Sequence, residues 1–162
     1  MKTRKLRATA QPLKIDLTRK DVETVKRRWR WTTDSLDEIA ASNVLQYLTP
    51  VERIHFMNEA FRVLKATGKL MIVPPHWASG KAYGDLDAVM PPVSEAWFFF
   101  LDQAWRKVNT RKETRYHCDF VTTWGYGLHP LLVSRNQEYQ QHALKFFKEA
   151  AQDLVATLSK RS

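Results

Sequence analysis

The sequence predicts an α/β fold in which a mostly parallel sheet carries helices on both faces. Three observations support this prediction. The chain has 162 residues, of which 44% are apolar, so it can bury a core. Residues 37 to 73 have the spacing of a strand, a helix and a strand, which predicts two parallel strands joined by a crossover helix. Two later segments also place their apolar residues at helical spacing.

The charge of the chain is concentrated at its beginning. Residues 1 to 30 contain eleven Lys and Arg against three Asp and Glu, so they carry +8 of the formal net charge of +9. Residues 1 to 12 are polar and basic and end at Pro12, which predicts a flexible basic arm. A single globular domain is then expected over residues 13 to 162.

The first elements of this domain are predicted to be short. Leu13 to Leu17 alternates apolar and polar residues, as a strand does. Thr18 and Asp21 are three residues apart and have the pattern of a capping box. This pattern predicts a helix that runs to about Arg30.

The clearest helix start in the chain follows a predicted strand and turn at residues 37 to 45. Thr49 and Glu52 form a second capping box, and a proline stands at the first helical position. The helix is predicted to end before Gly68, to which we assign the role of a C-terminal turn residue. Residues 69 to 73 are then predicted to form a buried strand.

The second half of the domain is predicted to contain two helices and one strand. Residues 93 to 108 keep helical spacing, and residues 116 to 124 are rich in residues that favour strands. Residues 125 to 135 are expected to form a connection in which Gly125 to Gly127 is a turn. Residues 139 to 158 predict one long amphipathic helix that packs on the sheet.

The composition excludes several classes of site. The first of the five glycines is Gly68, so no glycine-rich phosphate-binding or dinucleotide-binding turn precedes it. Cys118 is the only cysteine, which excludes an internal disulfide and indicates a reducing, cytoplasmic location. No apolar run reaches the roughly 18 to 20 residues of a membrane helix, and the spacing of the histidines predicts no metal site.

Two stretches of the chain carry a resemblance to a known family. Residues 34 to 48 read DSLDEIAASNVLQYL, and residues 56 to 75 read FMNEAFRVLKATGKLMIVPP. The chain resembles the C-terminal half of class I S-adenosylmethionine-dependent methyltransferases, in the compact form found in phages and prophages. The resemblance covers about residues 34 to 160. It implies an N-terminally truncated, Rossmann-like sheet, S-adenosylmethionine as the cofactor and, for a phage protein, a location in the host cytoplasm.

The resemblance also implies roles for individual residues. In the family, a glycine-rich turn after the first strand, an acid at the end of the second strand and groups near the third and fourth strands hold the cofactor. If residues 13 to 17 are the second strand, Asp16 is the acid that binds the ribose. Asn43, Gln46 and Tyr47 stand where the family's fourth-strand motif has His, Glu and His. The glycine-rich turn has no counterpart, so the resemblance implies a degenerate cofactor site.

The candidate catalytic residues lie in the loop after residues 69 to 73. His76 follows two prolines there, at the expected rim of the site, and Asp85 and Asp87 stand where the family has a D-P-x-H loop. A cluster of these three side chains in a cleft would perturb their pKa values, as catalytic groups require. The alternative is that His76 is an inert residue of an exposed loop.

Basic and aromatic residues near the beginning of the chain indicate a contact with nucleic acid. Cations neutralise phosphates and indole rings stack on unpaired bases, so RNA, single-stranded DNA or a nucleoprotein is the candidate partner. The alternative is a solvated basic surface with two tryptophans in the core. The candidate residues are Lys2, Arg4, Lys5, Arg7, Arg27, Arg28, Trp29, Arg30 and Trp31.

These observations leave three functions open. The first is a methyltransferase-family protein with a degenerate cofactor site, which is weakly active or acts as a binding module. The second is a competent S-adenosylmethionine-dependent methyltransferase with a non-standard cofactor loop. The third is a phage-encoded protein that binds nucleic acid or a host nucleoprotein through its basic N-terminal segment. The sequence also leaves open whether the chain forms a homo-oligomer.

Overall fold

The structure is a computed structural model that describes residues 13 to 110 and 114 to 161. The basic arm predicted at residues 1 to 12 lies outside the described residues. Among the described residues, no helix is long and apolar enough to cross a membrane.

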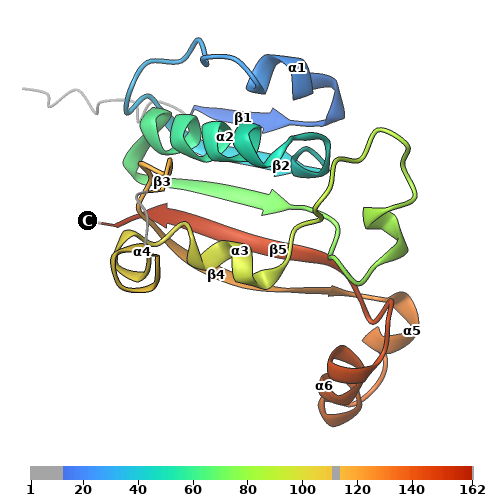
Figure 1. Cartoon of the computed structure of the whole chain (residues 1–162). Helices are drawn as coiled ribbons and strands as arrows, with labels where there is room; N and C mark the ends of the chain where they lie inside the picture. The colour runs from blue at the N-terminus through green and yellow to red at the C-terminus, as the bar shows by residue number, and fades with distance from the viewer. Residues whose placement is uncertain (1–12, 111–113, 162) are drawn as a thin grey trace, which may run out of the picture.

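A five-stranded sheet forms the centre of the molecule (Figure 1). The strand order is β1-β2-β3-β5-β4. β1, β2 and β3 are parallel, whereas β5 is antiparallel to both of its neighbours, so the sheet is parallel in one half only. The strands are β1 (Lys14–Leu17), β2 (Leu36–Ser42), β3 (Leu64–Val73), β4 (Phe120–Leu128) and β5 (Ala151–Lys160).

The predicted strand, helix, strand unit is confirmed. α2 (Pro50–Val63) joins β2 to β3, and the two strands are parallel neighbours in which Ile39 is opposite Leu70. Thr49 and Glu52 form the predicted capping box, because each side chain accepts a hydrogen bond from the backbone of the other.

Gly68 has a different role from the predicted one. α2 ends at Val63 and β3 begins at the next residue, so Gly68 lies inside a strand rather than at the end of a helix. A Cβ atom there would lie 3.0 Å from the carbonyl oxygen of Leu36 and 2.8 Å from Leu64 Cδ2. The register between β2 and β3 also shifts between Leu36 and Glu38. Glycine is therefore required by the close approach of the neighbouring strand.

The prediction of one long helix at residues 139 to 158 is wrong. The segment forms α6 (Gln137–Phe146) and then β5, which lies between β3 and β4. Leu154, Ala156 and Leu158 are buried at alternate positions, as in a strand with one covered face. The predicted turn at Gly125 to Gly127 is also wrong, because these residues lie within β4.

The remaining helices are short. α1 (Val22–Val25) follows the predicted capping box of Thr18 and Asp21 but ends well before Arg30. Beyond its end, the backbone N–H of Trp29 donates to the Glu59 carboxylate and not to a helical carbonyl. The others are α3 (Glu95–Phe99), α4 (Gln103–Asn109) and α5 (Pro130–Val133), with 3₁₀ turns η1 (Arg19–Asp21), η2 (Leu45–Tyr47) and η3 (Gly80–Ala82).

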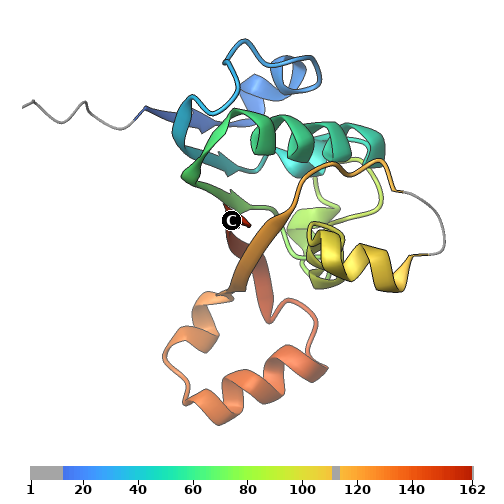
Figure 2. The same cartoon turned by 90° about the vertical axis from the view of Figure 1, so that its left-hand side faces the viewer.

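The helices α2, α3 and α4 lie on the same face of the sheet (Figure 2). This face holds the core, which includes Phe56, Leu70 and Leu154. On the opposite face Met71, Val121 and Val155 are 40%, 43% and 43% exposed, and none of the described helices covers them. The α/β class is therefore confirmed, but the predicted helices on both faces are present on only one.

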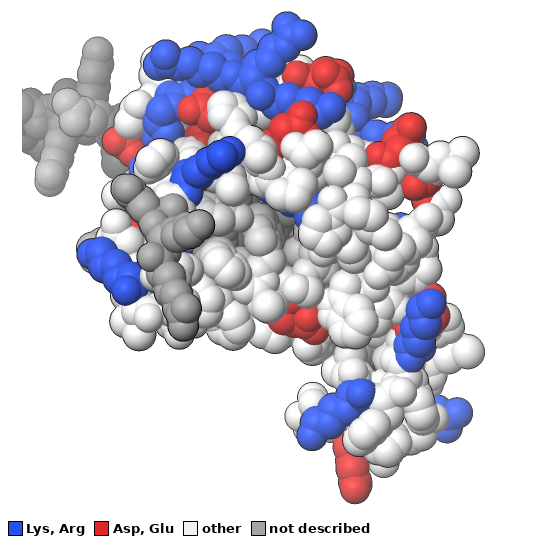
Figure 3. Space-filling view, in the orientation of Figure 1, with Lys and Arg blue, Asp and Glu red and all other residues white. Residues whose placement is uncertain are grey.

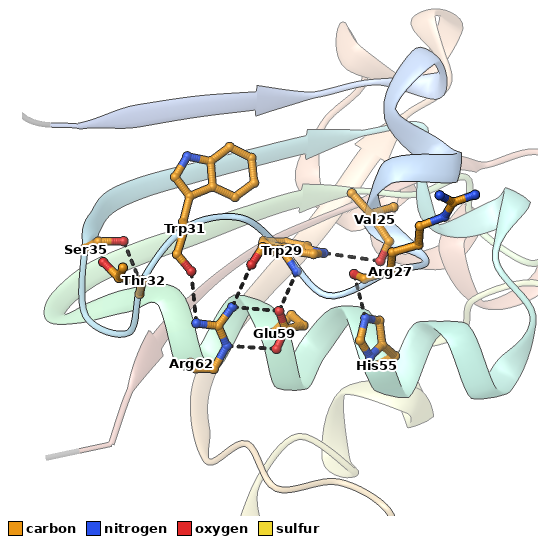
Figure 4. A network of polar contacts seen from close by, with 9 residues as sticks. All are labelled: Val25, Arg27, Trp29, Trp31, Thr32, Ser35, His55, Glu59 and Arg62. Carbon is orange, nitrogen blue, oxygen red and sulfur yellow. Dashed lines mark hydrogen bonds and ion pairs between the residues drawn. The ribbon is translucent and has the colours of Figure 1, made fainter.

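A network of polar contacts joins α2 to the segment between α1 and β2 (Figure 4). Arg62 donates to both carboxylate oxygens of Glu59, from Nε at 2.8 Å and from Nη2 at 2.7 Å. Glu59 Oε2 also accepts from the N–H of Trp29 at 2.7 Å. Arg62 donates further to the carbonyls of Trp29 and Trp31, at 3.2 and 3.0 Å. The pair thus binds the backbone of a segment without regular structure.

The substitution Glu59→Gln tests this network. Because hydrogen bonds to charged groups contribute about 1.5 to 3 kcal/mol, the free energy of unfolding should fall by about 2 kcal/mol near pH 7. The hydrogen bonds and charge of Arg62 lower the pKa of Glu59 despite its burial. The stabilisation by the Glu59 carboxylate is therefore fully present above the pKa that Glu59 has in the unfolded chain. It is lost as the pH falls through the pKa that Glu59 has in the folded protein. Urea unfolding between about pH 7 and about pH 3 measures both effects.

Glu23→Gln is the matched control. Glu23 pairs with Lys26 at an exposed site, so its loss should change the free energy of unfolding by less than about 0.5 kcal/mol. An equal loss in the two variants would contradict the role of the network, as would a Glu59→Gln deficit that does not shrink in acid.

Candidate functional site

A cleft lies where the parallel strands β2 and β3 end. Open α/β sheets bind ligands outside the carboxyl ends of their strands, because the loops there converge without covering the strand ends. The cleft has a volume of about 590 Å³. Its lining includes Asn43, Gln46, Tyr47, Lys81, Asp85 and Asp87.

Asn43 and Gln46 form the end of the cleft that follows β2. Asn43 has a φ of 54°, a left-handed conformation that asparagine tolerates better than most residues. Gln46 Nε2 donates to Asn43 Oδ1 at 3.3 Å. Gln46 Oε1 is buried and has no hydrogen-bond partner among the described residues. A ligand with an N–H or O–H donor at this point would remove the cost of that unpaired acceptor.

A charged cluster closes the other side of the cleft. Arg19 donates to Asp85 at 2.9 Å and to Asp87 at 2.6 Å, and its guanidinium lies 4.8 Å from the centre of the Tyr47 ring. The Tyr47 hydroxyl donates to Asp85 Oδ2 at 2.7 Å. This hydrogen bond, the backbone N–H of Asp87 and the charge of Arg19 lower the pKa of Asp85. Burial and the same carboxylate raise the pKa of Tyr47.

The turn after β1 satisfies its own backbone groups. The N–H of Thr18 donates to the Asp21 carboxylate at 2.8 Å, and the N–H of Asp21 donates to the Thr18 carbonyl at 2.9 Å. The N–H of Lys20 reaches the Thr18 hydroxyl at 3.4 Å. These N–H groups are therefore occupied inside the turn, in contrast to the free N–H groups of a glycine-rich turn that cradles a ligand.

Arg53 holds the wall of the cleft through a buried guanidinium. Its Nε donates to the carbonyl of Leu45 at 2.9 Å, Nη1 to that of Pro91 at 2.6 Å and Nη2 to that of Val89 at 3.1 Å. The N–H of Val89 in turn donates to the carbonyl of Gln46 at 2.7 Å. Arg53 thus joins the segment of Leu45 and Gln46, which follows β2, to residues 89 to 91.

His76 belongs to a different cluster from Asp85 and Asp87. His76 Nδ1 accepts from the N–H of Ala78, so the ring proton is on Nε2, which donates to Glu95 at 2.9 Å. The Tyr126 hydroxyl donates to the same carboxylate oxygen at 2.9 Å. Burial and this carboxylate raise the pKa of Tyr126 to about 12.

The structure therefore separates the predicted site residues. It brings Asn43, Gln46 and Tyr47 together with Asp85 and Asp87, as a site requires. His76 is 5% exposed, so it is not an exposed loop residue. Its ring is hydrogen-bonded to Glu95 and not to Asp85 or Asp87.

Asp16 also lies apart from the cleft. It is exposed in the middle of β1, opposite Ala40, and its strand neighbour Leu17 is the one that points into the core. Sequence reasoning missed Arg19 and Lys81, which lie at the cleft. The signal for Arg19 was its place in the turn directly after a predicted strand. Within the described ranges, no three His, Cys, Asp or Glu side chains are arranged to hold a metal ion.

A basic surface lies beside α1. Figure 3 shows Lys and Arg gathered at the top of the view, over α1 and β1. Arg27, Arg28 and Arg30 are exposed, and none forms an ion pair with a described residue. Lys2, Arg4, Lys5 and Arg7, which the sequence adds to this surface, lie outside the described residues.

The two tryptophans of this segment differ in their surroundings. Trp29 is 3% exposed, packs edge-on against Phe56 with ring centres 5.2 Å apart and donates from Nε1 to the Val25 carbonyl. Its ring is therefore not open to a base, in contrast to the predicted stacking role. Trp31 is half-buried, and the Arg30 guanidinium lies 5.0 Å from its ring centre.

Comparison with solved structures supports the fold. A SAM-dependent methyltransferase from Archaeoglobus fulgidus matches with a TM-score of 0.55 and 15% identity, over 86% of this chain and 64% of that chain. The fold is methyltransferase-like. A complex between the Haloferax volcanii Trm112 methyltransferase activator and a methyltransferase matches with a TM-score of 0.48 and 12% identity, over 82% and 57%. This chain spans less than two thirds of the length of each of these two chains. No protein-family model and no curated protein sequence matches it.

The substitution Tyr47→Phe tests the charged cluster. It removes only the hydroxyl that donates to Asp85, and that hydrogen bond is the largest effect that lowers the pKa of this carboxyl. The pKa of Asp85 should therefore rise toward the ordinary range, as measured by NMR titration of the side-chain carboxyl. Tyr83→Phe is the matched control, because Tyr83 donates to the carbonyl of Trp77. An Asp85 pKa that Tyr47→Phe leaves unchanged would contradict the cluster.

Proposed function

We propose that this methyltransferase-like chain is a binding module with a degenerate cofactor site, and that it takes S-adenosylmethionine or a related nucleoside only weakly. The observation that carries the proposal is the turn after β1. Thr18 and Asp21 accept hydrogen bonds from three N–H groups of this turn, those of Thr18, Lys20 and Asp21, so these three are not free for a ligand.

The residues present do not fit a tightly held S-adenosylmethionine. Three N–H groups of the turn are already occupied, Asp16 is not among the residues that line the cleft, and Arg19 pairs with both aspartates at the cleft. Methyl transfer depends on holding the methyl group in line with its acceptor at near-attack distance. Without a cradle that placement is lost, and this supports a binding role rather than fast catalysis.

The cleft nevertheless has features of a binding site for a small polar molecule. Gln46, a lining residue of the cleft, has an unpaired acceptor in its Oε1, and the Tyr47 ring lines the cleft on the side of the charged cluster. An exocyclic amino group next to a flat ring, as in adenine, meets both requirements. A nucleoside is therefore the ligand class that these residues favour.

Calorimetric titration tests the weakness of the cofactor site. S-adenosylmethionine and S-adenosylhomocysteine should bind with a Kd above about 100 µM, because each hydrogen bond contributes only about 0.5 to 1.5 kcal/mol net. A Kd of a few micromolar would instead favour a competent methyltransferase with a non-standard loop. Asp16 and Asn43 would then be the first residues to change.

NMR titration tests whether the cleft is the binding site. S-adenosylmethionine or adenosine at about 5 mM should shift the side-chain amide signal of Gln46, and Gln46→Met should weaken binding about threefold to tenfold. Gln103→Met is the matched control, because Gln103 is exposed at the start of α4. The absence of any shift with both S-adenosylmethionine and adenosine, or an equal effect of the two variants, would overturn the proposal.

The basic surface supports a second function, the binding of single-stranded nucleic acid. The observation that favours this function is that three exposed arginines beside α1 have no acidic partner among the described residues. Phosphates are the groups that such a surface attracts most strongly. Because Trp29 is in the core, only Trp31 of the two tryptophans is placed to contact a base.

The salt dependence of binding tests this second function. Replacing Arg27, Arg28 and Arg30 by Ala should reduce the slope of log affinity against log salt by about 0.7 per lost contact, or about 2 in all. Fluorescence anisotropy with a labelled single strand measures the slope. The matched control replaces Arg135, Lys145 and Lys148, which are exposed around α6. No binding at low salt, or an equal change in both variants, would contradict the function.

A further inference from the structure

β4 is an open edge of the sheet. It is the last strand in the order β1-β2-β3-β5-β4, and no described strand lies beyond it (Figure 1). Its nine residues, FVTTWGYGL, contain no charged residue and no proline. Natural edge strands are normally protected from pairing by charges, prolines or short length. β4 has none of these protections.

The backbone groups that face outward along β4 can be identified. The N–H of Phe120 donates to the Leu101 carbonyl at 2.9 Å, outside the sheet, so this residue faces away from β5. Residues of an antiparallel strand alternate in direction, so Thr122, Trp124 and Tyr126 also face outward. No described residue outside the sheet bonds the backbone groups of these three. They therefore present a row of donors and acceptors at the edge.

The opposite edge of the sheet is different. β1 has four residues, and Lys14 and Asp16 among them are charged and exposed. Lys14 forms an ion pair with Glu38 of β2. This edge is short and charged, as protected edges are. The contrast makes β4 the edge that is suited to pairing.

We propose that β4 pairs in antiparallel orientation with β4 of a second copy of this chain, about a two-fold axis at Trp124, to form one continuous sheet. In this arrangement Trp124 of one copy is opposite Trp124 of the other. Thr122 of each copy is opposite Tyr126 of the other, and both belong to the outward-facing set. The identical edges thus place donors opposite acceptors without any change in the strand.

The side chains of β4 also complement each other about this axis. On the uncovered face of the sheet, Thr123 of one copy is opposite Gly125 of the other, and Val121 is opposite Gly127. A Cβ atom built on Gly125 meets nothing within 4 Å, so this position has room for the partner's threonine. On the helical face, Trp124 is 39% exposed and loses that exposure on pairing. No charge has to be matched or buried, which favours an identical partner over an acidic or basic one.

Sedimentation velocity across a range of concentrations tests the proposal. The mass should rise from 19.0 kDa toward twice that value by about 100 µM. Thr122→Pro removes one outward N–H and should weaken self-association at least about tenfold. It should fold, because the outward N–H takes no part in the pairing with β5 and the buried Thr122 hydroxyl has no hydrogen-bond partner among the described residues.

Two further variants keep the test decisive. Thr123→Lys places a charge at the edge, opposite the partner's Gly125, and should also leave a monomer. Thr157→Lys is the matched control, because Thr157 is opposite Thr123 on the same face but one strand further in. It should leave the dimer intact. A monomer at every concentration would overturn the proposal, and so would a dimer that Thr157→Lys dissociates or that Thr122→Pro and Thr123→Lys leave unchanged.

Discussion

The arrangement of this molecule depends on α2, whose polar side chains bind the backbone of segments that lack regular structure. Buried N–H and C=O groups need partners, and loops cannot supply all of them. Arg53 binds three carbonyls beside the cleft, and Glu59 and Arg62 bind the segment before β2. Asn58 binds backbone groups of residues 115 to 118, just before β4. The helix α2 thereby contacts the backbone beside the cleft, the segment between α1 and β2, and the segment just before the edge strand β4.

The place of β1 in the sheet and the turn that follows it rest on different residues. Leu17 stays buried at the end of β1, so the strand keeps its place beside β2. The turn that follows is held by Thr18 and Asp21. Arg19 then spans from the turn to Asp85, next to exposed Lys20.

The single helical layer explains the composition of the strands. Parallel strands covered on both faces are continuously apolar, whereas strands with one solvated face alternate. β3 alternates, with Leu70 and Ile72 buried and Lys69 and Met71 exposed. Its neighbour β5 follows the same rule, with Val155 exposed between buried residues. The alternation of buried and exposed residues along β3 and β5 thus matches a sheet with one uncovered face.

The sequence by itself determined the local elements whose signals are local. The capping boxes at Thr18 and Thr49 and the apolar spacing of α2 depend on residues three or four apart, so they could be predicted. The absence of glycine before Gly68 likewise excluded a glycine-rich turn. Asn43, Gln46 and Tyr47 were placed in one site by the resemblance, because they stand where the methyltransferase family has its fourth-strand motif.

Only the tertiary structure decided the features that depend on distant partners. The spacing of Leu154 and Leu158 fits a helix as well as a strand. The segment forms a strand because it lies between β3 and β4, where its backbone groups find hydrogen-bond partners on both sides. Trp29 entered the core because Glu59, thirty residues away, binds its N–H. Side-chain direction in a strand alternates with register, so the pairing of β1 with β2 turned Asp16 away from the cleft.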